Sequence, residues 1–175
     1  MLGRHQSNRT LSRQTISVDQ SGKGGNPVQV KRLANGYLIR LDSGENVLDR
    51  LTQFANVYRI GFGAIRAIGT FARVTLGYYD ADAQTYRNQA VEEPVEVLNL
   101  SGNISKAENG QRMVHAHVVV GRSDYSALGG HLVDAIVGPT VEVIVETAPT
   151  TVRRRHDPDT GLQLWDLGAM ETFAA

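Results

Sequence analysis

The sequence contains no cysteine among its 175 residues. Disulfide bonds and thiolate metal sites are therefore excluded, and a metal ion would have to bind histidine, aspartate, glutamate or backbone oxygen. Long apolar runs are also missing, because no stretch approaches the roughly 18 consecutive apolar residues that a membrane helix needs. The first residues lack the apolar core of a secretory signal. These absences predict a cytoplasmic protein without a membrane segment.

Net charge is also absent overall, with 18 Lys and Arg residues against 18 Asp and Glu residues, but the charges are unevenly placed. Residues 1–32 hold six Lys or Arg residues and a single acid, Asp19, which gives a net charge of +5. Such a segment can contact phosphate or an acidic partner, or it can remain a solvated tail. Because residues 1–26 are polar and rich in Gly, Ser and Asn, we predict a flexible basic segment over residues 1–27 and a single domain over residues 28–175.

Alternation of apolar and polar residues predicts a protein built mainly of β-strands. Two alternating runs, residues 28–33 and 37–41, flank Asn35-Gly36, which is a strong hairpin signal. Other runs rich in β-branched and aromatic residues predict strands over residues 64–71, 72–79, 85–90, 95–100, 113–120 and 141–147. Helices do not regularly separate these runs, so a mainly antiparallel sheet is favoured over a parallel one.

One main helix is predicted between the hairpin and the later strands. Ser43 suits its N-cap, Glu45 lies in its first turn, and apolar residues follow at helical spacing as far as Tyr58. Gly61 is expected to end it. Residues 127–137 fit either a short helix or a strand. The predicted fold class is α+β, with a mainly antiparallel sheet packed with one main helix.

Three histidines form the most informative pattern. His115 and His117 lie two apart in a β-branched run, so their side chains are expected on one face of a strand. His131 follows Gly129-Gly130, where two residues without Cβ allow a tight bend and close approach. Three imidazoles with an open fourth position are typical of a catalytic zinc site, although Ni, Cu or Fe would also suit them. The alternative is three ordinary strand histidines paired with neighbouring groups.

Residues 153–155 are the densest basic run of the chain. Arg153, Arg154 and Arg155 can contact phosphate or a partner's carboxylate, or they can form a solvated or salt-bridged strand end. The dinucleotide-like stretch from Gly61 carries Arg66 at its third glycine position, so it is not interpreted as a nucleotide loop.

Several stretches in order resemble the PPC domain (plants and prokaryotes conserved domain), a domain often described as DNA-binding. They span about residues 35–167 and include Gly61-Phe62-Gly63-Ala64, residues 95–105 with Leu100-Ser101-Gly102-Asn103, His115-Ala116-His117-Val118, Gly129-Gly130-His131-Leu132, and Asp157-Pro158-Asp159-Thr160-Gly161-Leu162. The resemblance implies a compact domain with a mainly antiparallel sheet and a homotrimeric assembly. It also implies that His115, His117 and His131 cluster and bind a divalent metal, with zinc expected. Plant members carry Arg-Gly-Arg-Pro hooks, which this sequence lacks.

Three functions remain open at this point. The first is a DNA-binding or regulatory PPC protein with a three-histidine metal site. The second is a zinc-dependent hydrolase or lyase that acts on a small molecule at the metal, with Glu142 or Glu96 as the candidate general base. The third is a trimeric structural or interaction module. Asn103 and Glu142 are candidates to orient the metal ligands.

Overall fold

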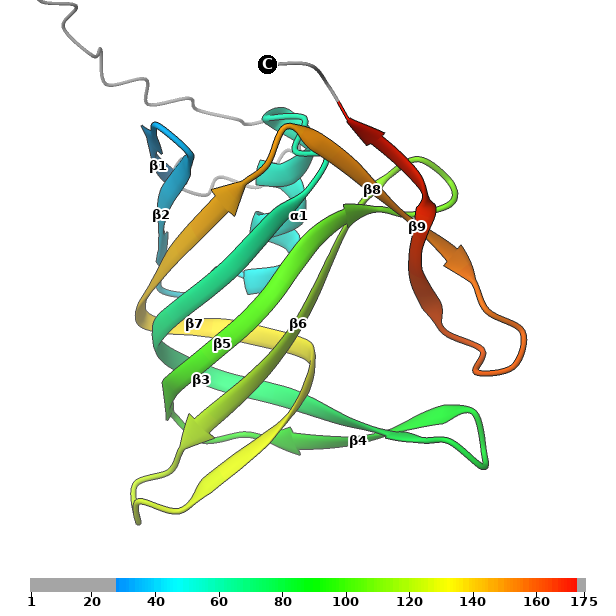
Figure 1. Ribbon diagram of the computed structural model, residues 1–175. Helices are drawn as coiled ribbons and strands as arrows, with labels where there is room; N and C mark the ends of the chain where they lie inside the picture. The colour runs from blue at the N-terminus through cyan, green and yellow to red at the C-terminus, as the bar shows by residue number, and fades with distance from the viewer. Residues whose placement is uncertain (1–27, 173–175) are drawn as a thin grey trace, which may run out of the picture.

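The computed structural model describes residues 28–172, which form one α-helix and nine β-strands (Figure 1). The elements are β1 (Gln29–Leu33), β2 (Gly36–Asp42), α1 (Val47–Val57), β3 (Gly63–Asp80), β4 (Thr85–Val91), β5 (Val95–Lys106), β6 (Arg112–Gly121), β7 (Ala127–Thr147), β8 (Thr150–His156) and β9 (Gln163–Thr172). Within these residues, no helix is long and apolar enough to cross a membrane. The predicted basic segment, residues 1–27, lies outside the described residues.

All nine strands belong to one sheet, in the order β1-β2-β7-β3-β5-β8-β9, with β4 paired to β3 and β6 paired to both β5 and β7. Every strand pair is antiparallel except β5–β8, whose parallel pairing is confined to Lys106 and Arg153. The predicted mainly antiparallel sheet with one helix is therefore confirmed. The pairings β3–β5, β5–β6, β6–β7 and β7–β3 also close into a ring of four strands.

The ring closes because its two long strands bend. β3 has 18 residues and β7 has 21, and their pairing shifts register at three places. Gly69 lies at one of these irregularities with φ of +143°, and a Cβ there would sit 2.3 Å from the backbone oxygen of Thr140. Only glycine allows this backbone conformation and this close approach, so Gly69 is part of what lets β3 turn from one partner to the next.

The ring encloses most of the core, and α1 covers one side of it. Phe71, Leu100, Val120 and Leu132 are fully or almost fully buried in this core. The helix buries Val47, Leu51, Phe54 and Ala55, and its Phe54 ring packs edge-on against Tyr37 of β2 at 5.1 Å. The opposite face of the sheet has no helix against it among residues 28–172 (Figure 1).

The predicted helix start was wrong by one turn. Asn46, not Ser43, is the N-cap, because its side-chain oxygen accepts a 3.0 Å hydrogen bond from the backbone N–H of Asp49. The helix ends at Val57, and Tyr58 rather than Gly61 caps it. A pattern of polar residues before an apolar run does not by itself distinguish one capping residue from another three positions away.

Three strand predictions also needed correction. Residues 64–71 and 72–79 form one continuous strand, β3, and the ambiguous 127–137 segment is the first half of β7. Both results follow from long-range pairing and not from local propensity. β3 pairs with β7 along both predicted segments, and residues 127–137 pair first with β6 and then with β3. The ribbon β8–β9 was not predicted. The sequence of β8 is polar, and the buried Arg154 takes an inward position that is usually apolar.

Candidate metal centre

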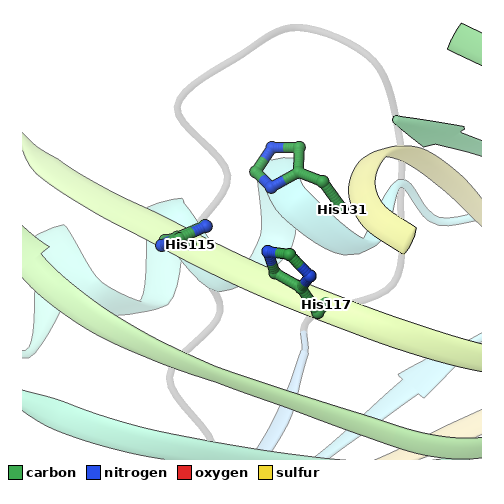
Figure 2. A group of neighbouring side chains, drawn as sticks. All are labelled: His115, His117 and His131. Carbon is green, nitrogen blue, oxygen red and sulfur yellow. The ribbon is translucent and has the colours of Figure 1, made fainter. Parts of the chain in front are cut away.

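Strand register brings the three histidines together. His115 and His117 lie on β6 with Ala116 between them, and Ala116 and Val118 point into the core, so both imidazoles lie on the other face of the sheet. His131 of β7 is the register partner of His117. Directly paired residues on neighbouring strands share a face, so His131 joins the other two. Figure 2 shows the three rings grouped around a common point.

The distances within this group suit a single metal ion. Ring centroids are 5.3 Å apart for His115 and His117, 5.1 Å for His115 and His131, and 5.4 Å for His117 and His131. One nitrogen from each ring lies within 4.8 Å of the others. Nitrogens bound to one tetrahedral zinc are about 3.4 Å apart, given bonds of about 2.0–2.1 Å, so small side-chain rotations would bring the rings to that spacing. The three rings are therefore placed as ligands, with no Asp or Glu in the group among the described residues.

Electrostatics hold two of the rings in the neutral form that binds metals. Burial lowers the pKa of His115 from 6.5 to about 4, helped by the charge of Arg154 and by the other two histidines. Burial and His117 also lower the pKa of His131. The Nδ1 atom of His131 is buried and has no hydrogen-bond partner among residues 28–172. A buried polar atom without a partner is uncommon, and a ligand would supply the missing interaction.

Arg154 is the charged residue closest to the histidines. Its side chain, only 6% exposed, reaches from β8 and places Nη2 at 3.2 Å from Nδ1 of His115. The same nitrogen donates to Oδ1 of Asn103 at 3.0 Å, while Nε donates to Oγ of Ser105 at 2.7 Å and Nη1 donates to the backbone oxygen of Gln163 at 2.6 Å. This network fixes the guanidinium against the His115 ring. Asn103, the register partner of His115, therefore acts on that ring through Arg154.

The arginine run does not act as one basic patch. Arg155 is exposed and forms a 2.9 Å ion pair with Asp166, whereas its neighbour Arg154 is buried against the site. Arg153 lies on β8 opposite Asp166 in the register. The alternation of a strand explains the difference, because Val152 and Arg154 share the inward face. Sequence reasoning identified the run but not the distinct role of Arg154.

Neither candidate base lies with the histidines. Glu142 is exposed on β7 and pairs in register with Arg40 and Ile68, and Glu96 is exposed on β5 and pairs with Gly121 and Thr70. No hydrogen bond or ion pair described for residues 28–172 joins either glutamate to a histidine of the group. The structure therefore gives no support for Glu142 or Glu96 as a base or as a ligand-orienting group.

Sequence reasoning also missed Tyr86. Its ring lies 4.8 Å from the ring of His131, at an interplanar angle of 32°, and the Tyr79 ring packs edge-on against it at 5.2 Å. The Tyr79 hydroxyl donates to the backbone oxygen of Thr160, and Gln84 Nε2 donates to that of Asp159 at 2.6 Å. The β3–β4 hairpin and the β8–β9 ribbon, which extend to the same side in Figure 1, are thus joined at their tips. Tyr86 follows a turn in a polar strand, and nothing in the sequence linked it to the histidines.

The protein is thus an α+β protein with a closed, mainly antiparallel strand ring and a group of three histidines on the outer face of that ring. The Plants and Prokaryotes Conserved (PCC) domain model matches residues 29–149. The chain belongs to this family. No protein of curated function matches the chain.

Solved structures of similar proteins support the same assignment. A candidate DNA-binding protein from Bacteroides thetaiotaomicron is 34% identical, with a TM-score of 0.78, over 81% of this chain and 98% of that one. A candidate DNA-binding protein from Ralstonia eutropha is 30% identical, with a TM-score of 0.74, over 79% of this chain and 95% of that one. A metal-containing protein from Archaeoglobus fulgidus is 32% identical, with a TM-score of 0.70, over 77% of this chain and 94% of that one.

The lowered pKa of His115 predicts a pH-dependent loss of stability in the metal-free protein. The unfolded chain takes up a proton on this residue near pH 6.5, whereas the folded protein does so only near pH 4. Between these values the unfolded state binds more protons, so the free energy of unfolding should fall as the pH is lowered through this window. Urea unfolding between pH 7 and pH 4.5 should show this fall, and it should be smaller in His115→Gln.

The control for this measurement is His156→Gln, because His156 is exposed and lies outside the group. This variant should keep the pH dependence of the parent. NMR titration of the His115 ring gives the direct reading, with an expected midpoint near 4. A midpoint above 6 would contradict the described environment of the ring.

Proposed function

We propose that this protein binds one divalent transition-metal ion, zinc, through His115, His117 and His131. The observation that carries the proposal is the convergence of three imidazoles from paired strands, with their ligand nitrogens within 4.8 Å of one another. Neutral imidazole suits zinc, and the lowered pKa of His115 and His131 favours that neutral form. The metal content of the Archaeoglobus relative, 32% identical, supports the same assignment.

Three protein ligands leave a coordination position for water or for a small molecule. Zinc bound in this way would lower the pKa of a coordinated water to about 7. The chain's own residues surround the histidines: Arg154 contacts the His115 ring, and the Tyr86 ring lies against that of His131. This arrangement supports the zinc-dependent hydrolase or lyase as the chemical alternative. No Asp or Glu of residues 28–172 belongs to the histidine group, so no carboxylate is assigned there as a general base.

Metal binding is expected to have a stoichiometry of one zinc per chain. His117→Ala removes the imidazole that pairs with His131 and should lower zinc affinity at least about a hundredfold, since two neutral ligands hold zinc poorly. Isothermal titration calorimetry of protein purified without a nickel column measures both quantities. His156→Ala is the matched control and should bind as the parent does. Unchanged zinc binding in His117→Ala would exclude the site.

DNA association is a second candidate function. Two relatives at 34% and 30% identity are candidate DNA-binding proteins, and residues 1–32 of this chain carry a net charge of +5. The remaining residues carry a net charge of −5, so we propose that contact with DNA is made by the basic segment rather than by the sheet. A regulatory role would follow from such binding.

Binding through this segment should be weak, indifferent to base sequence and steeply dependent on salt, because neutralised phosphates release counterions. Fluorescence anisotropy with two unrelated duplexes should give similar affinities that fall sharply between about 50 and 200 mM salt. Deletion of residues 1–26 should abolish the binding while zinc binding persists. Sequence-specific binding by the truncated protein would show that the sheet, not the segment, reads DNA.

We also propose that the protein is a homotrimer. The sheet face opposite α1 exposes apolar side chains, among them Leu38 at 39%, Ile68 at 59% and Ile144 at 40%. Leu38 pairs with Ile144, and the same row of register partners runs through Arg66 and Ser101 to His117. Burial of such a face between copies is favourable, and it would bring a neighbouring subunit close to the metal centre.

Light scattering coupled to size exclusion should give a mass of about three chains at micromolar concentration. Ile68→Glu places a charge on the most exposed of these three side chains and should shift the mass toward one chain, without unfolding, because Ile68 is not in the core. A stable monomer in the parent protein would contradict this proposal.

A further inference from the structure

Arg154 is a buried positive charge that no acidic side chain of the described residues compensates. It is 6% exposed, and among the described residues it makes no ion pair with an Asp or Glu. Its partners are the Ser105 hydroxyl, the Asn103 amide, a backbone carbonyl and a ring nitrogen of His115, and none of these is an acidic group. Burial of a charge without a counter-charge is costly, so such a group usually faces an anion. Arg155 next to it has its anion, Asp166, at 2.9 Å.

A metal ion at the three histidines would add to this charge instead of balancing it. The ligands are neutral imidazoles, and no Asp or Glu of the described part of the chain belongs to the group. A divalent ion would therefore keep its full charge, with the guanidinium against one of its ligands. Together the ion and Arg154 carry three positive charges, in surroundings where burial strengthens electrostatic interactions.

We propose that the open position of this metal centre takes a small oxyanion, a carboxylate being the chemical class that fits, and that Arg154 sets this preference. The inference rests on the proposed metal site and deepens it, because it names the kind of ligand. Negative charge at the open position is the compensation that neither the ligands nor the surrounding described side chains provide. A neutral ligand would leave all three positive charges in place.

Arg154 does not serve to strengthen the metal itself. A guanidinium only donates hydrogen bonds, so at 3.2 Å it requires Nδ1 of His115 to accept. A histidine that binds a metal through its other nitrogen normally carries a hydrogen on Nδ1 and donates it to an acceptor. The guanidinium therefore opposes metal binding, both by charge and by this hydrogen bond, while it favours an anion. This opposition separates the proposed role from a merely structural one. If Arg154 were only structural, its loss would weaken both metal binding and anion binding.

The test uses the full-length protein loaded with Co²⁺, whose visible absorption reports on the ligand in the open position. Acetate is the anionic probe and imidazole is the neutral probe. In Arg154→Met, acetate affinity should fall about tenfold, the size of effect that one nearby charge produces. Imidazole affinity should stay within about twofold, and Co²⁺ affinity itself should stay equal or rise. Arg155→Met, the same substitution one residue later at an exposed position, should change none of these values.

Arg154→Lys keeps the charge and should retain acetate affinity within about threefold. If Arg154→Met does not fold, Arg154→Lys keeps the test decisive. Ser105→Ala is then measured beside it, because this variant removes one hydrogen bond of Arg154 and leaves its charge in place. Two results in Arg154→Met would overturn the role of Arg154. One is an equal loss of affinity for acetate and for imidazole, and the other is weaker Co²⁺ binding together with weaker acetate binding. Binding of Co²⁺ to the parent with no response to acetate would overturn the anion preference and leave the metal site standing. Failure of the parent to bind Co²⁺ or Zn²⁺ would overturn the proposed function as well.

Discussion

The register between β6 and β7 is the constraint on which the candidate site depends. These strands pair over only five residue pairs, from His117 with His131 to Gly121 with Ala127. A shift of one residue would turn every side chain of one strand to the opposite face, placing a histidine in the core and a core residue such as Leu132 outside. Burial of the apolar set on the inner face therefore fixes the histidines on the outer face. Core packing and site geometry are consequences of the same pairing.

Charge gives the site its chemical character. Among the described residues the histidine group contains no acid, and Arg154, the charged side chain that contacts it, is cationic and buried. Burial and the charge of Arg154 act in the same direction, because both lower the pKa of His115 and favour its neutral form. A metal held here would be an unusually electron-poor centre, because neutral ligands leave its charge undiminished. The observed surroundings therefore favour a ligand that brings negative charge.

Much of this arrangement could be predicted from the sequence. The spacing of His115 and His117 predicts one strand face, and Gly129-Gly130 before His131 predicts a close approach. The structure brings the three histidines together, with both glycines inside strand β7 and not at a bend. The mainly antiparallel sheet followed from the distribution of β-branched runs. These features depend on local periodicity, which a single sequence displays.

Features that depend on long-range pairing could not be predicted in this way. Arg154 reaches His115 across 39 residues of sequence, and no sequence pattern links Tyr86 of β4 to His131 of β7. Glu142 was proposed because a base was needed, not because a pattern placed it, and the register puts it opposite Ile68 rather than near the histidines. The N-cap of the helix differs from the predicted Ser43 because of another long-range contact. Asn46 donates a 2.6 Å hydrogen bond to Asp134, which lies 88 residues away in the sequence.

X-ray absorption spectroscopy of the zinc-loaded protein tests the central claim most directly. It reports the identity and distance of the atoms bound to the metal without regard to any activity. The arrangement described here predicts three imidazole nitrogens at about 2.0–2.1 Å and one further light-atom ligand, with the imidazole signal falling to two rings in His117→Ala. Zinc bound by one imidazole or none, or a spectrum unchanged in His117→Ala, would contradict the assignment of His115, His117 and His131 as a metal centre.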